Sequence, residues 1–197
     1  MTQKPTKRKR GKELNDAIFQ AALFILKNEG YDAVSFQDVA KRAGTSRSVL
    51  YRHWQTPFNL LSAATSDKIL STRDSLHDIT FDTGSLRGDL ISVLNYLLDN
   101  LRLFPENMIP AIAQEIARGN NPLSPEFFAS EEFFDKILSQ ALTRGEIKAL
   151  PKQSQRALFF NVIRYDMIFN FSQMNYHHLE VIVDEILLPI YFSNSAV

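Results

Sequence analysis

The sequence lacks cysteine entirely and has little glycine and proline, seven and eight residues among 197. Without cysteine there is no disulfide scaffold, no cysteine-based zinc ribbon and no cysteine nucleophile. The scarcity of glycine and proline disfavours a turn-rich all-β fold. No apolar run reaches the roughly 18–20 residues that span a membrane, so we expect no membrane partner and a cytoplasmic location. Phosphate-binding, nucleophile-elbow and zinc-protease motifs are missing too, and we therefore expect no enzyme activity, no cofactor and no metal.

The charged residues are divided unevenly along the chain, although 22 basic and 22 acidic residues balance overall. Residues 1–56 carry 11 lysine and arginine residues against 5 acidic ones, whereas residues 57–197 carry 11 against 17. Residues 1–10 form a basic arm without any acid, which we expect to be flexible. This uneven distribution of charge predicts that the N-terminal part of the chain, residues 1–56, binds a polyanion. A solvated basic tail is the alternative that composition leaves open.

Apolar residues recur at spacings of three and four through most of the chain, which predicts an all-α protein of about nine helices. Start signals accompany this periodicity: Ser35 lies three residues before Asp38, and Thr56 precedes Pro57. The alternating pattern typical of strands is missing. The expected helices cover residues 13–29, 36–43, 46–54, 57–76, 86–101, 105–119, 127–144, 151–174 and 179–192.

Residues 34–53 predict a helix-turn-helix, because two short helices meet at a tight turn that contains Gly44. On a helical wheel Leu50 and Trp54 lie together as anchors of the second helix, with Ser48 and Arg52 on the opposite side. The outer face then offers guanidinium, hydroxyl, phenol and small apolar groups, which read base edges or contact phosphates. A small helical corner with a solvated polar face is the alternative. The candidate DNA-binding residues are Ser35, Lys41, Arg42, Thr45, Ser46, Arg47, Ser48, Val49, Tyr51, Arg52 and His53.

The stretch VSFQDVAKRAGTSRSVLYRHW (residues 34–54) resembles the DNA-binding segment of the tetracycline-repressor (TetR) family of bacterial transcription regulators. Residues 14–30 resemble the first helix of that family, and the leucine pair at 60–61 resembles the apolar pair of its fourth helix. The resemblance covers about residues 11–71 and implies a DNA-binding head there. It also implies that residues 72–197 form a helical domain for effector binding and dimerisation.

Three positions depart from the pattern of this family. Pro57 stands where the family commonly has a lysine that helps to hold phosphate, so that cation is missing here. Trp54 stands in place of the usual phenylalanine, which is a conservative change for an anchor. Ser48 replaces a frequent glycine, which alters the approach of the backbone to DNA.

The last two expected helices are apolar on every side, across residues 157–171 and 181–191. Such helices need cover on more than one side, so we expect a homodimer. The TetR resemblance implies the same, because members of that family dimerise through their last two helices as a four-helix bundle. A core formed within one chain is the alternative. The candidate interface residues are Phe159, Ile163, Phe169, Ile182, Ile186 and Ile190.

The resemblance further implies a pocket among the middle helices for a small-molecule effector. In this family, effector binding moves the DNA-binding heads apart and weakens their affinity. The pocket candidates are polar residues within apolar stretches, for which surface or satisfied core positions are the alternative. They are Asn95, Tyr96, Gln114, Asn161, Arg164 and Asp166.

We therefore expect a repressor that binds a palindromic operator on double-stranded DNA as a homodimer and leaves it when an effector binds. One alternative is an activator. Another is a non-specific or ligand-independent DNA-binding protein. A third is a helical enzyme or partner-binding module whose front domain is vestigial.

Overall fold

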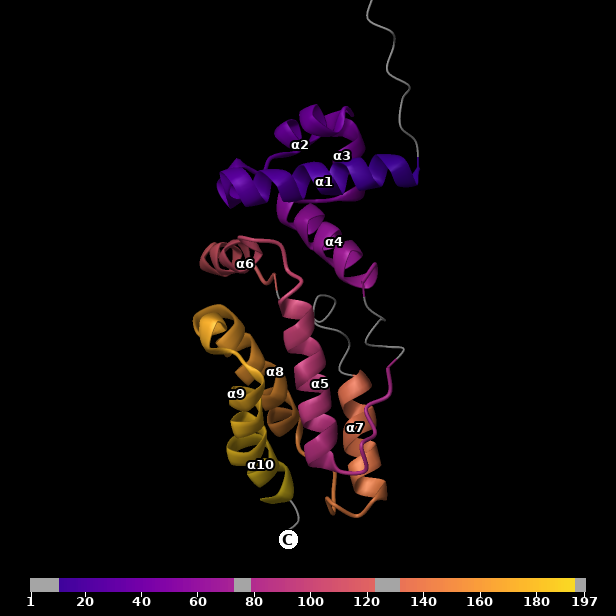
Figure 1. Ribbon diagram of the computed structural model, residues 1–197, viewed down its shortest axis with the longest axis vertical. Coiled ribbons are helices and arrows are strands. Elements are labelled where there is room, and N and C mark those ends of the chain that lie inside the picture. The colour runs from indigo at the N-terminus through magenta and orange to yellow at the C-terminus, as the bar shows by residue number, and fades with distance from the viewer. Residues whose placement is uncertain (1–10, 73–78, 123–131, 194–197) are drawn as a thin grey trace, which may run out of the picture. The chain divides into compact units, whose positions relative to one another are not determined.

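The computed structural model describes residues 11–72, 79–122 and 132–193, so the predicted basic arm at residues 1–10 lies outside the described part. Within that part the regular elements are helical and no strand occurs, which confirms the predicted all-α class. Nine helices result there when α9, η4 and α10 are counted as one continuous helix (Figure 1). None of the described helices is both long and apolar enough to span a membrane. The elements are α1 (Lys12–Glu29), η1 (Tyr31–Ala33), α2 (Phe36–Ala43), α3 (Arg47–His53), α4 (Pro57–Leu70), α5 (Leu86–Leu101), α6 (Met108–Ala117), α7 (Glu132–Thr143), α8 (Gln153–Phe169), η3 (Phe171–Gln173), α9 (Tyr176–Val181), η4 (Ile182–Leu187) and α10 (Leu188–Ser193).

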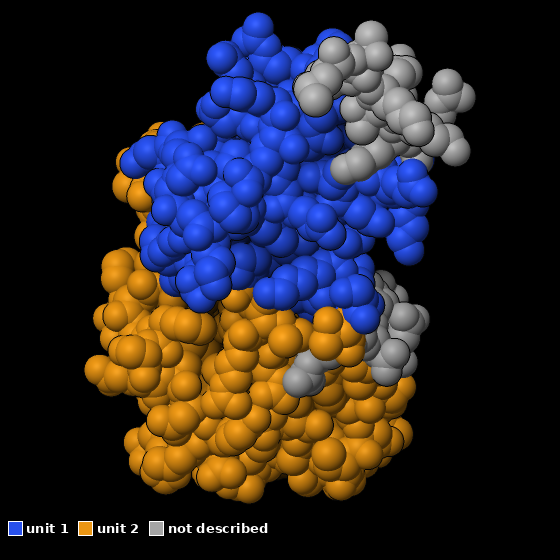
Figure 2. All heavy atoms as spheres, turned by 45° about the horizontal axis from the view of Figure 1, so that its top comes forward, with its two compact units in different colours: residues 1–71, 105–111 blue, residues 72–104, 112–197 orange. Residues whose placement is uncertain are grey.

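The chain forms two compact units, which Figure 2 distinguishes by colour. The first unit holds residues 1–71 and 105–111, and the second holds residues 72–104 and 112–197. The short segment that follows α5 belongs to the first unit, where the Asn107 side chain donates a hydrogen bond to the carbonyl of Leu26 at 3.0 Å. Helix α6 therefore begins in the first unit and continues in the second.

Local capping sets the helix starts in the first unit. The Ser35 hydroxyl accepts a hydrogen bond from the backbone N–H of Asp38 at 3.1 Å, which begins α2. Thr56 and Asn59 each accept a bond from the other's backbone N–H at 3.1 Å, which begins α4. Between α2 and α3, Gly44 takes the left-handed conformation (φ 71°, ψ 39°), where a side chain is strained. These starts confirm the capping signals at Ser35 and Thr56.

Several expected helices are shorter than predicted, among them α4, α6 and α8. Helix α8 ends at Phe169, because Asn170 leaves the helical conformation (φ −127°, ψ 22°) and donates its side-chain amide to Asp166 at 2.9 Å. Asn175 then caps α9 with its side-chain carbonyl. Helix α4 ends at Leu70, and part of its predicted continuation lies outside the described residues. Asparagine at a helix end competes for local hydrogen bonds, which the apolar periodicity does not reveal.

Five aromatic side chains form a cluster within the core of the second unit. Phe134 of α7 stacks on Phe159 of α8 with ring centroids 4.5 Å apart. Phe133, Phe160 and Tyr191 surround this pair at centroid distances between 5.1 and 6.4 Å. Aromatic pairs in stacked and edge-on geometries add to the energy of burial. One side of α8 is therefore covered by α7 and α10 of its own chain.

The last helix contains a six-residue π-helical segment, η4. Leu179, Val183, Leu187 and Tyr191 are fully buried at a strict spacing of four residues. Four residues of an α-helix overshoot one turn by about 40°, so such a row drifts around the helix. A turn of π-helix contains more than four residues, so four residues there fall short of one full turn, and the row drifts around the helix in the opposite direction. The π-helical segment thus keeps this row facing the core.

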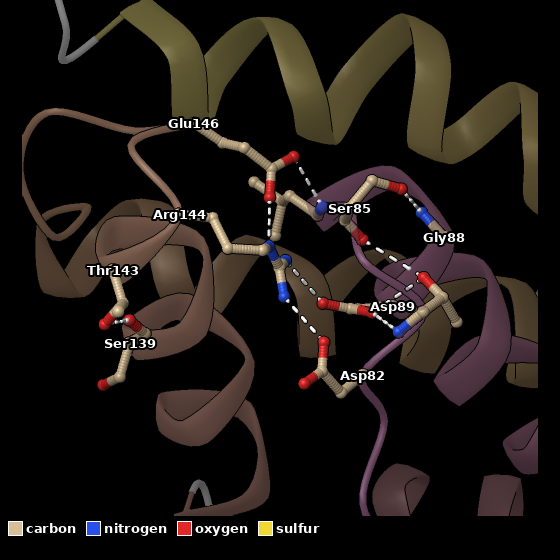
Figure 3. Close-up of polar contacts among 10 residues, drawn as sticks. Asp82, Ser85, Gly88, Asp89, Ser139, Thr143, Arg144 and Glu146 are labelled. Carbon is tan, nitrogen blue, oxygen red and sulfur yellow. Dashed lines mark hydrogen bonds and ion pairs between the residues drawn. The ribbon is translucent and has the colours of Figure 1, made fainter.

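An ion-pair cluster around the buried carboxylate of Asp89 joins the start of α5 to the turn after α7 (Figure 3). Asp89 is 0% exposed, and its carboxylate accepts bonds from Arg144 at 2.7 Å and from the backbone N–H and hydroxyl of Thr83 at 2.6 and 2.8 Å. Arg144 also pairs with Asp82 at 3.0 Å and with Glu146 at 2.6 Å. Burial acts to lower the pKa of Arg144, but the hydrogen bonds to Glu146 and Asp89 outweigh it, so this pKa is raised. The cluster fixes two segments that are far apart in the sequence.

Candidate nucleic-acid interface

Helix α3 presents a polar face to solvent. It is anchored by Leu50, which is fully buried, and by Trp54, whose ring packs edge-on against Phe19 of α1 with centroids 5.8 Å apart. The predicted anchor pair is therefore confirmed. Ser35 and Thr45 are half-buried. The exposed candidates are Lys41, Arg42, Ser46, Arg47, Ser48, Tyr51, Arg52 and His53.

Val49 does not belong to this face. It is only 9% exposed, so the prediction that it points outward is wrong. Val49 is the neighbour of Leu50 and lies 100° from it around α3, and the side of α3 that packs against α2 is wide enough to cover both.

The three described arginines of the first unit have neutral partners. Arg42 of α2 lies over the ring of Phe24 of α1, with its guanidinium carbon 3.2 Å from the ring centroid. Arg47 donates from Nη1 to Oε1 of Gln37 at 3.3 Å. Arg52 donates from Nε to the carbonyl of Ser48, one turn earlier in α3, at 3.4 Å. None of the three pairs with a carboxylate of the described residues, so each keeps its full charge.

The arginines of the second unit are arranged differently. Five of its six described arginines pair with a carboxylate, and the sixth, Arg164, bonds to Asn161. The five pairs are Arg87–Asp184, Arg102–Asp99, Arg118–Glu115, Arg144–Asp89 and Arg156–Asp135. Arg42, Arg47 and Arg52, the described arginines of α2 and α3, thus differ from most arginines of the second unit in having no carboxylate partner among the described residues, and their charge attracts polyanions.

The hydroxyl-bearing residues of α3 have defined local contacts. Tyr51 lies edge-on to the buried ring of Phe36, with centroids 4.8 Å apart, so its ring is held while the side chain stays exposed. The hydroxyls of Ser46 and Ser48 are hydrogen-bonded to each other at 2.9 Å. Ser46 therefore precedes α3 without capping it through its side chain.

Phe24 and Gln37 are residues of this surface that the sequence analysis did not assign. Phe24 forms part of the apolar periodicity of α1, and Gln37 is an ordinary polar residue of α2. Their partners, Arg42 and Arg47, lie 18 and 10 residues further along the chain, so no local pattern reveals these contacts. Only the packing of α1, α2 and α3 brings them together.

The polar residues predicted for an effector pocket have varied surroundings. Asp166 is buried, and its carboxylate is hydrogen-bonded to His178 at 2.8 Å and Asn170 at 2.9 Å. It is therefore a satisfied core group that ties α8 to α9. Asn161 is exposed and accepts a bond from Arg164 at 3.3 Å on the same helix.

The other pocket candidates lie on α5 and α6. Tyr96 packs edge-on against Phe81 with centroids 6.0 Å apart, and Gln114 is half-buried. Asn95 has a buried side-chain oxygen that finds no hydrogen-bond partner within the described part of the chain. A buried acceptor of this kind costs free energy unless a further group satisfies it.

The predicted interface residues divide into two groups. Phe159, Ile163 and Ile182 are buried inside one chain, so the prediction that they face a partner is wrong. The reason is the core of the second unit, where the chain covers these sides of α8 and η4 itself. Phe169 and Ile186 are 71% and 38% exposed, and Ile190 is half-buried.

Tyr165 joins the exposed group, although the sequence analysis did not select it. It is 58% exposed and packs against Phe169 with ring centroids 5.1 Å apart. Large apolar side chains that are exposed together are typical of protein–protein contacts. The last turns of α8 thus expose two aromatic side chains that the described part of one chain leaves uncovered.

Comparison with known proteins gives a consistent result. Residues 18–64 match the family model described as bacterial regulatory proteins, tetR family. The DNA-binding transcriptional repressor TetR of Mycobacteroides abscessus is 31% identical over 150 residues, which cover 70% of this chain and 72% of that protein. The transcriptional regulator FadR from Bacillus subtilis, solved in complex with stearoyl-CoA, superposes with a TM-score of 0.59 at 18% identity, covering 91% of this chain and 98% of that one. An HlyIIR mutant protein superposes with a TM-score of 0.56 at 16% identity, covering 86% and 96%. The two structures support the fold alone.

Proposed function

The chain belongs to the tetR family of bacterial regulatory proteins, and we propose that it represses transcription as a homodimer that reads a palindromic operator. It is a transcription regulator and not an enzyme. The observation that carries the proposal is the exposed face of α3, where Arg47 and Arg52 have no carboxylate partner among the residues that the structure describes. A small-molecule effector then releases the dimer from DNA.

Each side chain of the face has a role that follows from its chemistry. Arg47 and Arg52 form bidentate hydrogen bonds to guanine, and Ser48 bonds to a base edge beside them. Tyr51 and Lys41 contact phosphates and so fix the position of α3 in the major groove. Further backbone contacts come from Ser35, Arg42, Thr45, Ser46 and His53.

The homodimer is supported by the exposed face of the last helices. Phe169 and Tyr165 form an exposed aromatic pair on α8, and Ile186 is exposed on η4. A second copy that covers these residues creates a two-fold axis. Two reading helices related by such an axis meet half-sites about one turn of DNA apart, roughly 34–36 Å, so the operator is an inverted repeat.

Repression and effector release rest on the relatives and on one buried group. The relative from Mycobacteroides abscessus is named a repressor, and the FadR structure of similar fold holds stearoyl-CoA. In this chain the unpartnered oxygen of Asn95 is the group that we assign to a ligand donor. The further candidates for ligand contacts are Tyr96, Gln114, Asn161 and Arg164. The carboxylate of Asp166 already has hydrogen bonds to Asn170 and His178.

Selection from a random-sequence duplex library tests DNA reading. The full chain is expected to enrich an inverted repeat, and Arg52→Ala to lose a base preference of about 1–3 kcal/mol at one position of each half-site. Lys41→Ala is the matched control, because loss of a phosphate contact weakens binding to all sequences alike. Equal binding to every duplex contradicts the proposal.

A reporter gene behind the selected operator tests the direction of regulation. A repressor lowers transcription from this promoter when the protein is produced, and Arg52→Ala restores it. Higher transcription in the presence of the wild-type chain contradicts repression and supports an activator.

A further inference from the structure

Gln37 connects the two helices of the helix-turn-helix. It lies in α2, one residue after the start of that helix, and its Oε1 accepts a hydrogen bond from Nη1 of Arg47 at 3.3 Å. Arg47 is the first residue of α3. Both side chains are exposed, so solvent or DNA reaches the rest of the guanidinium.

The neutral partner matters for the charge of Arg47. An amide oxygen engages one of the five guanidinium donors and leaves the charge and the other donors free. A carboxylate at the same place forms a stronger, charge-assisted pair and cancels the charge. The nearest carboxylate on α2, that of Asp38, is held by the Ser35 hydroxyl at 2.5 Å. Gln37 therefore directs Arg47 without neutralising it.

A directed arginine discriminates between bases better than a free one. An unrestrained arginine side chain loses rotamer freedom on binding and adapts to several acceptors. A guanidinium fixed in one plane matches the paired acceptors of one guanine edge and fits other edges poorly. The direction given by α2 therefore matters for sequence choice.

We propose that Gln37 is a positioning residue that directs Arg47 toward one base pair of each half-site and so sets the base preference there. This inference rests on the proposed DNA-reading function. It assigns the specificity at that position to a pair of residues, one from each helix, rather than to α3 alone.

The test compares selections from a random-sequence duplex library with the full-length wild type, Arg47→Ala, Gln37→Ala and the double variant. Arg47→Ala removes the preference at one position, about 5- to 150-fold for a bidentate contact. Gln37→Ala reduces the preference at the same position by at least about threefold and leaves the other positions unchanged. The double variant matches Arg47→Ala, because Gln37 acts only through Arg47. Circular dichroism confirms that each variant is folded.

A charge change at Gln37 gives a second readout. In Gln37→Glu the carboxylate pairs with Arg47, so affinity for the selected operator falls at least about fivefold more than in Gln20→Glu. Gln20→Glu is the matched control, since it places the same charge on an exposed residue of α1. Equal affinities of these two variants overturn the proposal.

The remaining outcomes are equally decisive. If Gln37→Ala changes a position that Arg47→Ala leaves alone, Gln37 contacts a base directly and the positioning role is wrong. If it weakens all positions equally, the residue is merely structural and the role is again wrong. If the wild type enriches no sequence at all, the proposed function fails first, and this inference falls with it.

Discussion

Replacing Arg144 by methionine removes the only cation that the structure places against the buried carboxylate of Asp89 within the described residues. Methionine fills a similar space but leaves Asp89 with two hydrogen bonds, both from Thr83. Removal of one partner of a buried ion pair costs about 3–5 kcal/mol, because the other charge stays buried without compensation. Since Thr83 retains its two bonds, we expect about 3 kcal/mol.

Urea unfolding of the full chain, followed by circular dichroism, measures this loss. Arg87→Met is the matched control, because the Arg87–Asp184 pair has similar geometry, 2.6 and 2.8 Å, but is exposed to solvent. Exposed pairs are screened by water, so its loss is expected to be clearly smaller. Adding Asp89→Asn to Arg144→Met removes the stranded charge and is expected to recover at least about 1 kcal/mol. An Arg144→Met loss no larger than that of Arg87→Met, or no recovery in the double variant, refutes the reasoning.

Three further predictions concern the last helices. Phe169→Asp is expected to give a soluble monomer by light scattering, because the substitution places a carboxylate in the proposed interface; the control Leu142→Asp, at a 38% exposed leucine of α7 outside that interface, leaves the dimer intact, and a dimeric Phe169→Asp contradicts the interface. Burial raises the pKa of Tyr191, so above about pH 10 this tyrosine ionises in the unfolded chain before it does in the folded one, and the free energy of unfolding falls as pH rises. Tyr191→Phe is expected to remove this contribution. The same fall of the urea midpoint above about pH 10 in the variant and the wild type counts against this role of Tyr191. The hydrogen bond from Arg87 lowers the pKa of Asp184, so the pair stabilises the chain above roughly pH 4, and this stabilisation is lost as pH falls through the lowered pKa. Arg87→Met is expected to make the free energy of unfolding depend less steeply on pH below roughly pH 4. An equally steep dependence in the variant and the wild type refutes this prediction.

The sequence predicts those features of the fold that depend on local signals. Ser35 and Thr56 begin their helices because capping involves residues three positions apart, and apolar spacing identifies the helices themselves. The end of α8 at Asn170 was missed, because apolar residues continue past it and only the asparagine side chain breaks the helix. The row of buried residues spaced by four in the last helix is a signal for a π-helical segment that periodicity analysis can use.

The exposed residue types of α3 follow from the helical wheel, whereas their contacts do not. Apolar patterns show that a helix needs cover, but not whether the cover comes from the same chain, so Phe159 and Ile163 were assigned to a partner. The prediction that Val49 points outward was wrong for a related reason, because the width of the buried face of a helix depends on how the helices pack. The Arg47–Gln37 contact depends on the angle between two helices, which no local pattern gives.

Titration of the selected operator duplex with the full chain measures sequence reading and stoichiometry in one experiment. The single tryptophan, Trp54, directly follows α3, so its fluorescence reports binding at the proposed surface. A dimeric operator-reading protein saturates at two chains per inverted repeat at physiological salt and binds a duplex of the same composition in scrambled order at least about a thousandfold more weakly. Saturation at one chain per duplex, or equal affinity for the scrambled duplex, contradicts the proposed function.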